Sequence, residues 1–299
     1  MDYRKKKKTD LRALSIQWAS PMQTIFRSDI FQDRVIIVTG GGSGIGLRTA
    51  RELLMLHGTV VIAGRKAEKL QAARDFMLTE NPDAHTRLIA HTCNIRNEDE
   101  VRNLCARVVS QCGRIDCLVN NAGGQFPSKA EEITLKGWQA VIETNLTGTF
   151  LMSREVFRQS METHGGAIVN VIADISHGFP MMAHTGAARA GVENLTRSLA
   201  NEWGRAGVRV NSVAPGIIQS SGIDTYEPRF RDFVLSMGRY NQANRLGSEA
   251  EVAAAILYLL TPAAAFITGE TLKVDGGASI YTPIYPPVEH ERNSAFDGQ

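Results

Sequence analysis

The sequence predicts an α/β fold, a single doubly wound, mostly seven-stranded parallel sheet with helices on both faces. Segments typical of strands and of helices alternate along the chain and are joined by short links. The strand-like segments are rich in Val and Ile and lack polar alternation, which is typical of strands buried on both faces. A glycine-rich turn, Thr39–Gly46, joins the first of these strands to the first helix.

The expected elements follow one another in a regular order. Short apolar runs predict strands, and apolar residues spaced three or four apart predict helices. One further helix is expected before residue 150. The other helices are expected at 45–57, 67–78, 98–111, 150–163, 185–204 and 249–260. The strands are expected at 35–38, 59–63, 87–91, 116–119, 167–172, 209–213 and 271–274.

The chain divides into one domain and two tails. Residues 1–32 read as a basic, solvated tail, 33–278 as the dinucleotide-binding and catalytic domain, and 279–299 as a C-terminal tail. Residues 219–247 form one long irregular insertion after a strand. Its large apolar side chains are those of a substrate lid or of a helical hairpin packed on the body.

Composition and charge exclude several classes of protein. With 299 residues, 43% of them hydrophobic, the chain is long enough for a large core without disulfides. The net charge is +2 and much of the excess lies in the N-terminal tail, so we expect no nucleic-acid partner. The most apolar window, 252–268, contains Thr261 and Pro262, so we expect no membrane partner.

The cysteines and the chain ends carry no special signal. No CxxC pair occurs, so the four thiols are expected to be small buried groups in a reducing compartment, with no metal site. No signal peptide and no peroxisomal address is visible, so we expect a cytoplasmic protein.

The glycine-rich turn predicts a dinucleotide site of the Rossmann-like kind. Glycine allows a sharp turn and a close approach of phosphate to the backbone. The start of the following helix offers unpaired amides and the positive end of the helix dipole. The alternative is a merely structural turn. We expect the cofactor pyrophosphate to contact Gly40, Gly42, Ser43, Gly44, Ile45 and Gly46.

The residues after the second strand indicate which cofactor binds. Gly64 stands where NAD-binding proteins carry an acid, and Arg65 and Lys66 follow it. Basic side chains attract a 2′-phosphate, so the pair predicts NADPH/NADP. The alternative is a pair of solvated bases.

Several motifs together resemble those of the short-chain dehydrogenase/reductase family, from residue 35 to 277. They are TGGGSGIG, the run Asn120-Asn121-Ala122-Gly123, Asn145, Pro215-Gly216, and Asp275-Gly276-Gly277. The resemblance implies a homotetramer built through the helical stretches 144–163 and 185–204. It also implies that the cofactor contacts Asn94, Ile95, Asn121, Ala122, Gly123, Arg189, Pro215, Gly216 and Ile218.

The sequence departs from that family at its three standard catalytic positions. The family has a Tyr, a Lys four residues later and a Ser thirteen residues earlier. Here these positions are Thr185, Arg189 and Ile172. Thr has no pKa near neutrality, Ile forms no hydrogen bond, and Arg holds ribose hydroxyls but relays no proton. Carbonyl reduction with the usual acid is therefore not expected.

Four stretches are similar to the branch that holds the peroxisomal trans-2-enoyl-CoA and the 2,4-dienoyl-CoA reductases: 93–98, 121–126, 143–150 and 184–192. This branch reduces a C=C bond conjugated to a thioester. Hydride addition there gives an enolate, which neutral donors stabilise. The expected donors are Asn145 and Thr185, with Arg189 on the nicotinamide ribose. Asp174 either activates a water as proton donor or is a solvated loop acid.

Three functions remain open at this level. The first is an NADPH-dependent reductase of 2-enoyl-CoA or 2,4-dienoyl-CoA in fatty-acid metabolism, with an acyl-CoA as substrate. The second is a dehydrogenase of an acyclic terpenoid alcohol or aldehyde such as citronellol, which needs a proton acceptor such as His184 or Asp174. The third is a cofactor-binding scaffold without turnover, because the standard catalytic residues are lost.

Overall fold

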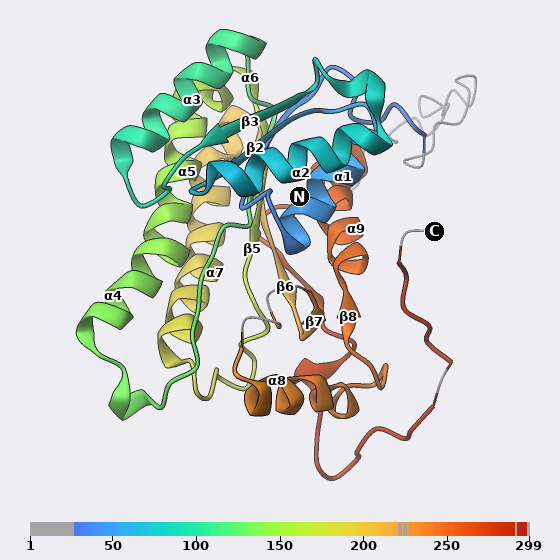
Figure 1. Cartoon of the computed structure of the whole chain (residues 1–299). Helices are drawn as coiled ribbons and strands as arrows, with labels where there is room; N and C mark the ends of the chain where they lie inside the picture. The colour runs from blue at the N-terminus through green and yellow to red at the C-terminus, as the bar shows by residue number, and fades with distance from the viewer. Residues whose placement is uncertain (1–26, 221–222, 224–225, 291, 298–299) are drawn as a thin grey trace, which may run out of the picture.

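A sheet of seven parallel strands forms the centre of the molecule (Figure 1). The computed structural model describes residues 27–297 except 221–222, 224–225 and 291. The strand order is β3-β2-β1-β4-β5-β6-β9, so the predicted doubly wound fold is confirmed. The strands are β1 (Val35–Thr39), β2 (Thr59–Gly64), β3 (Leu88–Thr92), β4 (Cys117–Asn120), β5 (Gly166–Val171), β6 (Val208–Pro215) and β9 (Thr271–Val274).

Helices cover both faces of the sheet and bury two apolar cores against it (Figure 1). One face carries α1 (Gly44–Met55), α2 (Ala67–Glu80) and α9 (Glu249–Leu260). The other carries α3 (Glu98–Cys112), α5 (Gly148–Val156) and α7 (Ala183–Trp203). Strands enclosed in this way face no water on either side, which accounts for their continuous Val and Ile runs. No described helix is both long and apolar enough to cross a membrane.

The helical stretch before β5 is interrupted twice by wider turns. It runs through α4 (Leu135–Ile142), a π-helical turn (Glu143–Thr147), α5, a second π-helical turn (Phe157–Met161) and α6 (Glu162–His164). A π turn adds one residue to the helical repeat and redirects the side chains around it. The first π turn contains Asn145, so the irregularity lies at a predicted site residue.

The insertion contains more regular structure than the sequence predicts. Its ends pair as β7 (Ile218–Gln219) and β8 (Gly247–Ser248), and it holds α8 (Pro228–Leu235) and a 3-10 turn, Ser236–Tyr240. Pro228 begins α8 at the position where a missing amide costs no hydrogen bond. The insertion lies beyond the strand ends that carry the glycine turn (Figure 1).

Two boundaries differ from their predictions. The predicted basic tail lies largely in residues 1–26, outside the described part. Phe31 is 2% exposed within the core, so the packed part of the chain begins before residue 33. Three cysteines are buried as predicted, whereas Cys112 is half-buried at the end of α3.

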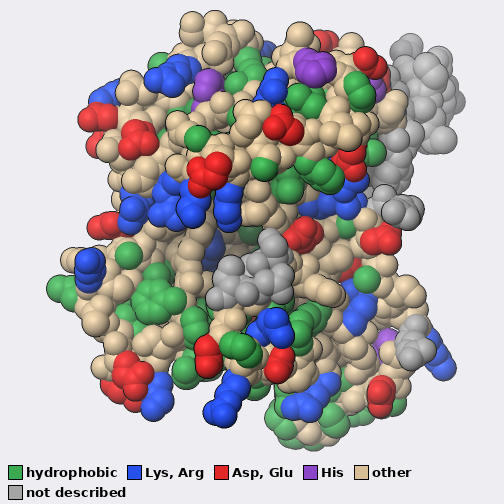
Figure 2. Space-filling model, viewed as in Figure 1, with side chains coloured by type: hydrophobic (Ala, Val, Ile, Leu, Met, Phe, Trp, Pro, Cys, Tyr) green, Lys and Arg blue, Asp and Glu red, His purple; other side chains and the backbone are tan. Residues whose placement is uncertain are grey.

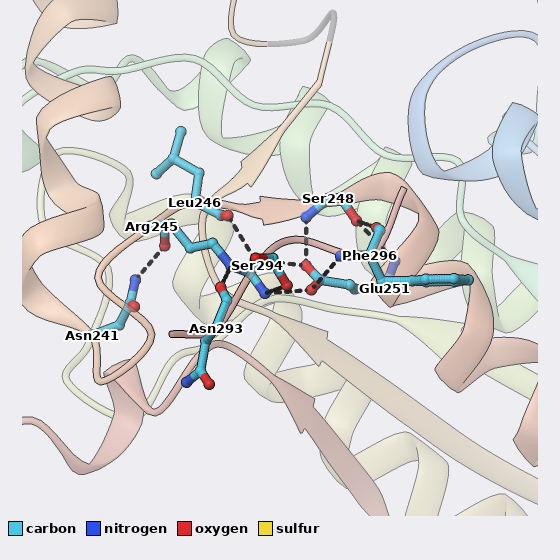
Figure 3. A network of polar contacts seen from close by, with 8 residues as sticks. All are labelled: Asn241, Arg245, Leu246, Ser248, Glu251, Asn293, Ser294 and Phe296. Atoms are coloured by element: carbon cyan, nitrogen blue, oxygen red, sulfur yellow. Dashed lines mark hydrogen bonds and ion pairs between the residues drawn. The ribbon is translucent and has the colours of Figure 1, made fainter. Parts of the chain in front are cut away.

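The C-terminal segment is held against the insertion by Arg245 (Figure 3). The Arg245 guanidinium forms two bonds to Glu251, Nη1–Oε2 at 2.9 Å and Nη2–Oε1 at 2.5 Å. The same guanidinium donates to the backbone carbonyls of Asn293 and Ser294. One half-buried ion pair therefore joins the insertion, the start of α9 and the tail.

Glu251 is also part of the N-terminal cap of α9. Its carboxylate accepts from the amides of Ser248 and Phe296, while Ser248 Oγ accepts from the Glu251 amide. Burial raises the pKa of Glu251, but the hydrogen bonds from Arg245, Ser248 and Phe296 and the Arg245 charge outweigh it and lower this pKa to about 2. The tail anchor therefore depends on an ionised carboxylate.

Replacing Glu251 by Gln is expected to release the tail. Amide hydrogen exchange in 292–297 should quicken about tenfold at pH 7 while the sheet stays protected. A depressed carboxyl pKa adds stability above pH 4.5 that is lost as the pH falls towards about 2, so the wild-type tail should loosen only in that window. The Glu249→Gln variant, whose side chain faces α1, is the control. Equal exchange rates in both variants would contradict the anchor.

Candidate active site

Thr39 and Asn121 tie together the two loops at the carboxyl edge of the sheet. Thr39 Oγ1 accepts from the amides of Asn121 (3.1 Å) and Ala122 (3.0 Å) and donates to the carbonyl of Val119. Asn121 Nδ2 donates to the carbonyls of Thr39 (3.1 Å) and Gly40 (3.4 Å). The Asn121 side chain thus shapes the predicted cofactor turn. Thr39 is a positioning residue that sequence reasoning missed.

The glycine turn leaves room that a dinucleotide would fill. Gly40 has a φ of +67°, and a Cβ on it would lie 2.9 Å from Asn121 Nδ2. A Cβ on Gly46 would lie 2.4 Å from the Gly40 carbonyl oxygen. Gly44 has a φ of +60° and no atom closer than 3.6 Å, and the Ser43 side chain caps no amide of α1. These open amides at a helix start fit a pyrophosphate.

The predicted bases Arg65 and Lys66 lie beside this turn. Both are exposed, and Lys66 is the N-cap residue that precedes α2. Gly42 faces the same helix, with a Cβ position 3.5 Å from the Lys69 carbonyl oxygen, while Ile45 packs partly buried on the core. Figure 2 shows Lys and Arg side chains gathered in a band across the middle of the molecule, next to a hollow.

Asn94 and Ile95 follow β3 on the far side of β2. Ile95 is buried, and its Cδ1 lies 2.6 Å from the position of a Cβ on Gly148, so that glycine makes room for it. Asn94 is half-buried, and its Oδ1 accepts from Arg96 Nε at 3.3 Å. Arg96 is a third base at this edge that sequence reasoning missed.

Arg189 places a positive charge in the interior of the site. It is 9% exposed, its Nη1 donates to the Val171 carbonyl at 2.8 Å, and its Nε has no partner. No carboxylate of the described residues pairs with it. Burial lowers the pKa of Arg189 to about 10. A Cβ on Gly123 would lie 2.4 Å from Arg189 Nη2. The guanidinium therefore lies directly against the loop that follows β4, residues 121–129, which we call the β4 loop. An unpaired buried cation of this kind fits the ribose hydroxyls of a cofactor.

Asn145 positions the β4 loop with its whole amide group. Its Nδ2 donates to the carbonyls of Gly124 (2.7 Å) and Val141 (2.9 Å), and its Oδ1 accepts from the Gly124 amide (3.2 Å). Neither amide hydrogen is left for a substrate. The structure therefore supports a positioning role for Asn145 in place of the predicted donor role.

A row of buried polar side chains fixes this geometry to the core. The row crosses from α5 through β4 and β5 to α7, and its hydrogen bonds are 2.8–2.9 Å long. Asn120 Nδ2 donates to Ser153 Oγ and to Asn170 Oδ1, and Asn170 Nδ2 donates to Thr196 Oγ1. Buried polar groups connected in this way specify one arrangement. The members are Thr149, Ser153, Asn120, Asn170 and Thr196.

Thr185 and its neighbour His184 begin α7 and are fully buried. The Thr185 amide donates to His184 Nδ1 at 2.8 Å, so the imidazole hydrogen lies on Nε2, which has no partner. The Phe126 ring packs edge-on against His184, with centroids 4.5 Å apart. At the Ser position, Ile172 is buried against Val192. The donor role of Thr185 stays a prediction, because its hydroxyl lies in the interior.

Asp174 and the residues after β6 form neighbouring loops. Asp174 Oδ1 accepts from the amide (3.1 Å) and hydroxyl (2.7 Å) of Ser176, and the Asp174 amide donates to the Pro215 carbonyl. Asp174 thus organises its own loop, and its role towards a water stays a prediction. His177 in the same loop is exposed.

The predicted contacts Gly216 and Ile218 are held by backbone pairing. The Gly216 amide donates to the Val274 carbonyl, and a Cβ there would lie 2.8 Å from Asp275 Cα. Ile218 is buried, with its Cδ1 against Gly247, so its side chain faces inward. The backbone beside Pro215 and Gly216 is left as the candidate contact surface.

One hydrogen bond links the β4 loop to the insertion. Gln125 Nε2 donates to the hydroxyl of Tyr226 at 2.9 Å. The Tyr226 ring is half-buried and packs edge-on against Phe230, with centroids 5.2 Å apart. Sequence reasoning found Tyr226 only as one apolar residue of the insertion, since 101 positions separate the two partners.

Known proteins resemble this chain over most of its length. A family profile described as "Enoyl-(Acyl carrier protein) reductase" matches residues 40–279. The peroxisomal 2,4-dienoyl-CoA reductase [(3E)-enoyl-CoA-producing] of Danio rerio is 37% identical over 259 residues, which cover 85% of this chain and 84% of that protein.

Two solved structures from Pseudomonas aeruginosa PAO1 share the fold. A citronellol catabolism dehydrogenase is 48% identical, with a TM-score of 0.75, covering 86% of this chain and 100% of that one. An NADPH-bound short-chain oxidoreductase described as containing an atypical catalytic center is 33% identical, with a TM-score of 0.77, covering 84% and 98%.

Replacing Arg189 by Met is expected to weaken NADPH binding about tenfold or more, while the cofactor-free protein unfolds at an unchanged or higher temperature. The reason is that an unpaired buried charge destabilises the empty protein and is compensated when a ligand accepts its hydrogen bonds. Fluorescence titration and calorimetry measure the two quantities. Arg197→Met, on an exposed turn of α7, should change neither. A lower unfolding temperature with unchanged affinity would show that the guanidinium serves the fold alone.

Proposed function

The chain belongs to the short-chain dehydrogenase/reductase family of NAD(P)-dependent enzymes, and on that basis we propose that it reduces the conjugated C=C bond of 2-enoyl-CoA or 2,4-dienoyl-CoA thioesters with NADPH. One observation carries the proposal. The family's Tyr and Ser positions hold Thr185 and Ile172, both buried and without an acidic proton. A carbonyl reductase must protonate an alkoxide as it forms, and these positions provide no acid for that step.

Reduction of an enoyl thioester makes a different demand on the site. NADPH, when bound, supplies the hydride. The electrons of the C=C bond then move onto the thioester oxygen, and a hydrogen-bond donor stabilises that charge. Arg189 holds the nicotinamide ribose, and the Thr39–Asn121 tie keeps the glycine turn in place. Since Asn145 has no free hydrogen, the donor must come from Thr185 turning outward or from another element.

The insertion offers the two surfaces that an acyl-CoA needs. Phe230 and Phe233 form an aromatic pair in α8, and Phe233 is 54% exposed. Arg229 and Arg231, on the same helix, are exposed bases suited to CoA phosphates. Arg245 is already bound to Glu251 and the tail. The name of the Danio rerio relative supports the same substrate class.

A second candidate is the oxidation of an acyclic terpenoid alcohol such as citronellol. The 48% identity to a citronellol catabolism dehydrogenase favours it. This reaction needs a base beside the alcohol. His184, one predicted base, is fully buried with its Nδ1 accepting from the Thr185 amide, so the site geometry favours the thioester.

We also propose that the chain assembles as a homotetramer. The predicted interface helix α5 exposes Phe150, and the outer edge of β9 pairs with no described strand. Beside that edge Leu272 is 37% exposed and Phe266 is fully exposed. Large apolar side chains next to an open strand edge are typical of surfaces that a further subunit covers.

Parallel assays with crotonyl-CoA, decenoyl-CoA and citronellal test the proposed function. NADPH oxidation, followed by absorbance, is expected with at least one thioester and not with the aldehyde. The reason is that only the thioester reaction proceeds without an acid at position 185. Turnover of the aldehyde alone would favour the terpenoid dehydrogenase instead.

Removing both charges in Arg65→Ala/Lys66→Ala is expected to raise the KM for NADPH about tenfold or more and to leave the KM for NADH within about twofold. The two bases lie beside the glycine turn, where only NADPH presents a 2′-phosphate. Steady-state kinetics with each cofactor measures this. Arg107→Ala, an exposed base on α3, is the control. An equal change for both cofactors would count against 2′-phosphate recognition.

A further inference from the structure

The phenol of Tyr226 contacts the β4 loop, which is itself bound by Asn145 in the π turn and by His184 in α7. Its partner Gln125 lies between Gly124 and Phe126. Gly124 is bound through both its amide and its carbonyl by Asn145, and the Phe126 ring packs on His184 at the start of α7. The Gln125 backbone is therefore fixed on both sides, and its side chain sets the position of the Tyr226 hydroxyl.

The hydrogen-bond arrangement leaves the phenolic hydrogen available. Gln125 Nε2 is the donor in its bond to Tyr226, so the tyrosine oxygen accepts and keeps its own hydrogen. No described residue accepts a hydrogen bond from the Tyr226 hydroxyl. By contrast, Asn145 uses both amide hydrogens, and Thr185 is fully buried. Tyr226 is half-buried, and its hydroxyl lies where the insertion meets the β4 loop.

We propose that Tyr226 is the catalytic residue that donates the proton in the reduction, with Gln125 as its positioning residue. This inference rests on the proposed function. A C–H bond forms at the β-carbon with hydride from NADPH, and the C=C electron pair moves to give an enolate. The Tyr226 O–H bond then breaks as a C–H bond forms at the α-carbon, and the phenolate recovers a proton from water. The thioester gains two electrons and NADPH loses two.

Other described tyrosines are placed elsewhere. Tyr240 packs edge-on against Tyr281 in the tail, and Arg239 lies over its ring. Tyr258 is part of α9, on the opposite face of the sheet from α7. Tyr226 alone among these is bonded to the β4 loop. The insertion thereby supplies the acid that α7 lacks at position 185.

The test uses Tyr226→Phe, with Tyr240→Phe as the matched control in the same insertion. With the thioester that the wild type turns over best, Tyr226→Phe is expected to lower kcat about 100-fold, with KM within about threefold. NADPH affinity, measured by fluorescence, should be unchanged. Gln125→Leu, which keeps the phenol but removes its partner, should lower kcat about tenfold. Tyr240→Phe should keep the wild-type kcat.

The experiment distinguishes a wrong role for Tyr226 from a wrong proposed function. If the wild type reduces a thioester and Tyr226→Phe keeps its kcat within about threefold, the proton-donor role is wrong and the proposed function stands. The same conclusion follows if Tyr226→Phe and Tyr240→Phe lose activity equally. If none of the thioesters supports NADPH oxidation by the wild type, the proposed function is wrong, and this inference is wrong with it.

Discussion

The buried guanidinium of Arg189 is the constraint around which the site is built. A cation removed from water without a carboxylate partner costs free energy, and among the described residues Arg189 has only the Val171 carbonyl as an acceptor. Its low exposure lowers its pKa to about 10. Gly123 has to be glycine because the guanidinium occupies the space of a Cβ. The Arg189 charge, Gly123 and the open turn beside Gly44 together fit a bound dinucleotide.

The rest of the molecule holds this arrangement in place. The Thr39–Asn121 tie joins the β1 and β4 loops, and the buried polar row connects the π turn at Asn145 to α7 through the sheet. The bonds of the polar row are buried and those of the Thr39–Asn121 tie are half-buried, and an unmade bond is expensive away from water. The carboxyl edge of the sheet is therefore rigid on the cofactor side. The insertion, the proposed substrate side, is fixed at its ends by the β7–β8 pair and by Arg245.

In the proposed mechanism, the acid that the family carries on α7 is replaced by one on another element, the insertion. Position 185 holds a buried threonine, whereas the phenol of Tyr226 in the insertion is hydrogen-bonded to the β4 loop. An enoyl thioester accommodates this change because charge builds on its oxygen before the carbon is protonated. Proton donation is then separable in space from the helix that carries the usual tyrosine.

The sequence by itself determined the seven strands of the main sheet and the main helices between them, because each is encoded by consecutive residues, but not the elements inside the insertion. The strand at 271–274 and the helix at 249–260 match β9 and α9. The sequence also identified the glycine turn and the replaced catalytic positions, because both are recognised by the spacing of residues along the chain. Only the tertiary structure determined which side-chain donors already have an acceptor within the protein and which remain available to a ligand. The partners of Asn145, Tyr226 and Arg245 come from distant segments, and a hydrogen bond depends on proximity in space, which packing of the whole sheet establishes.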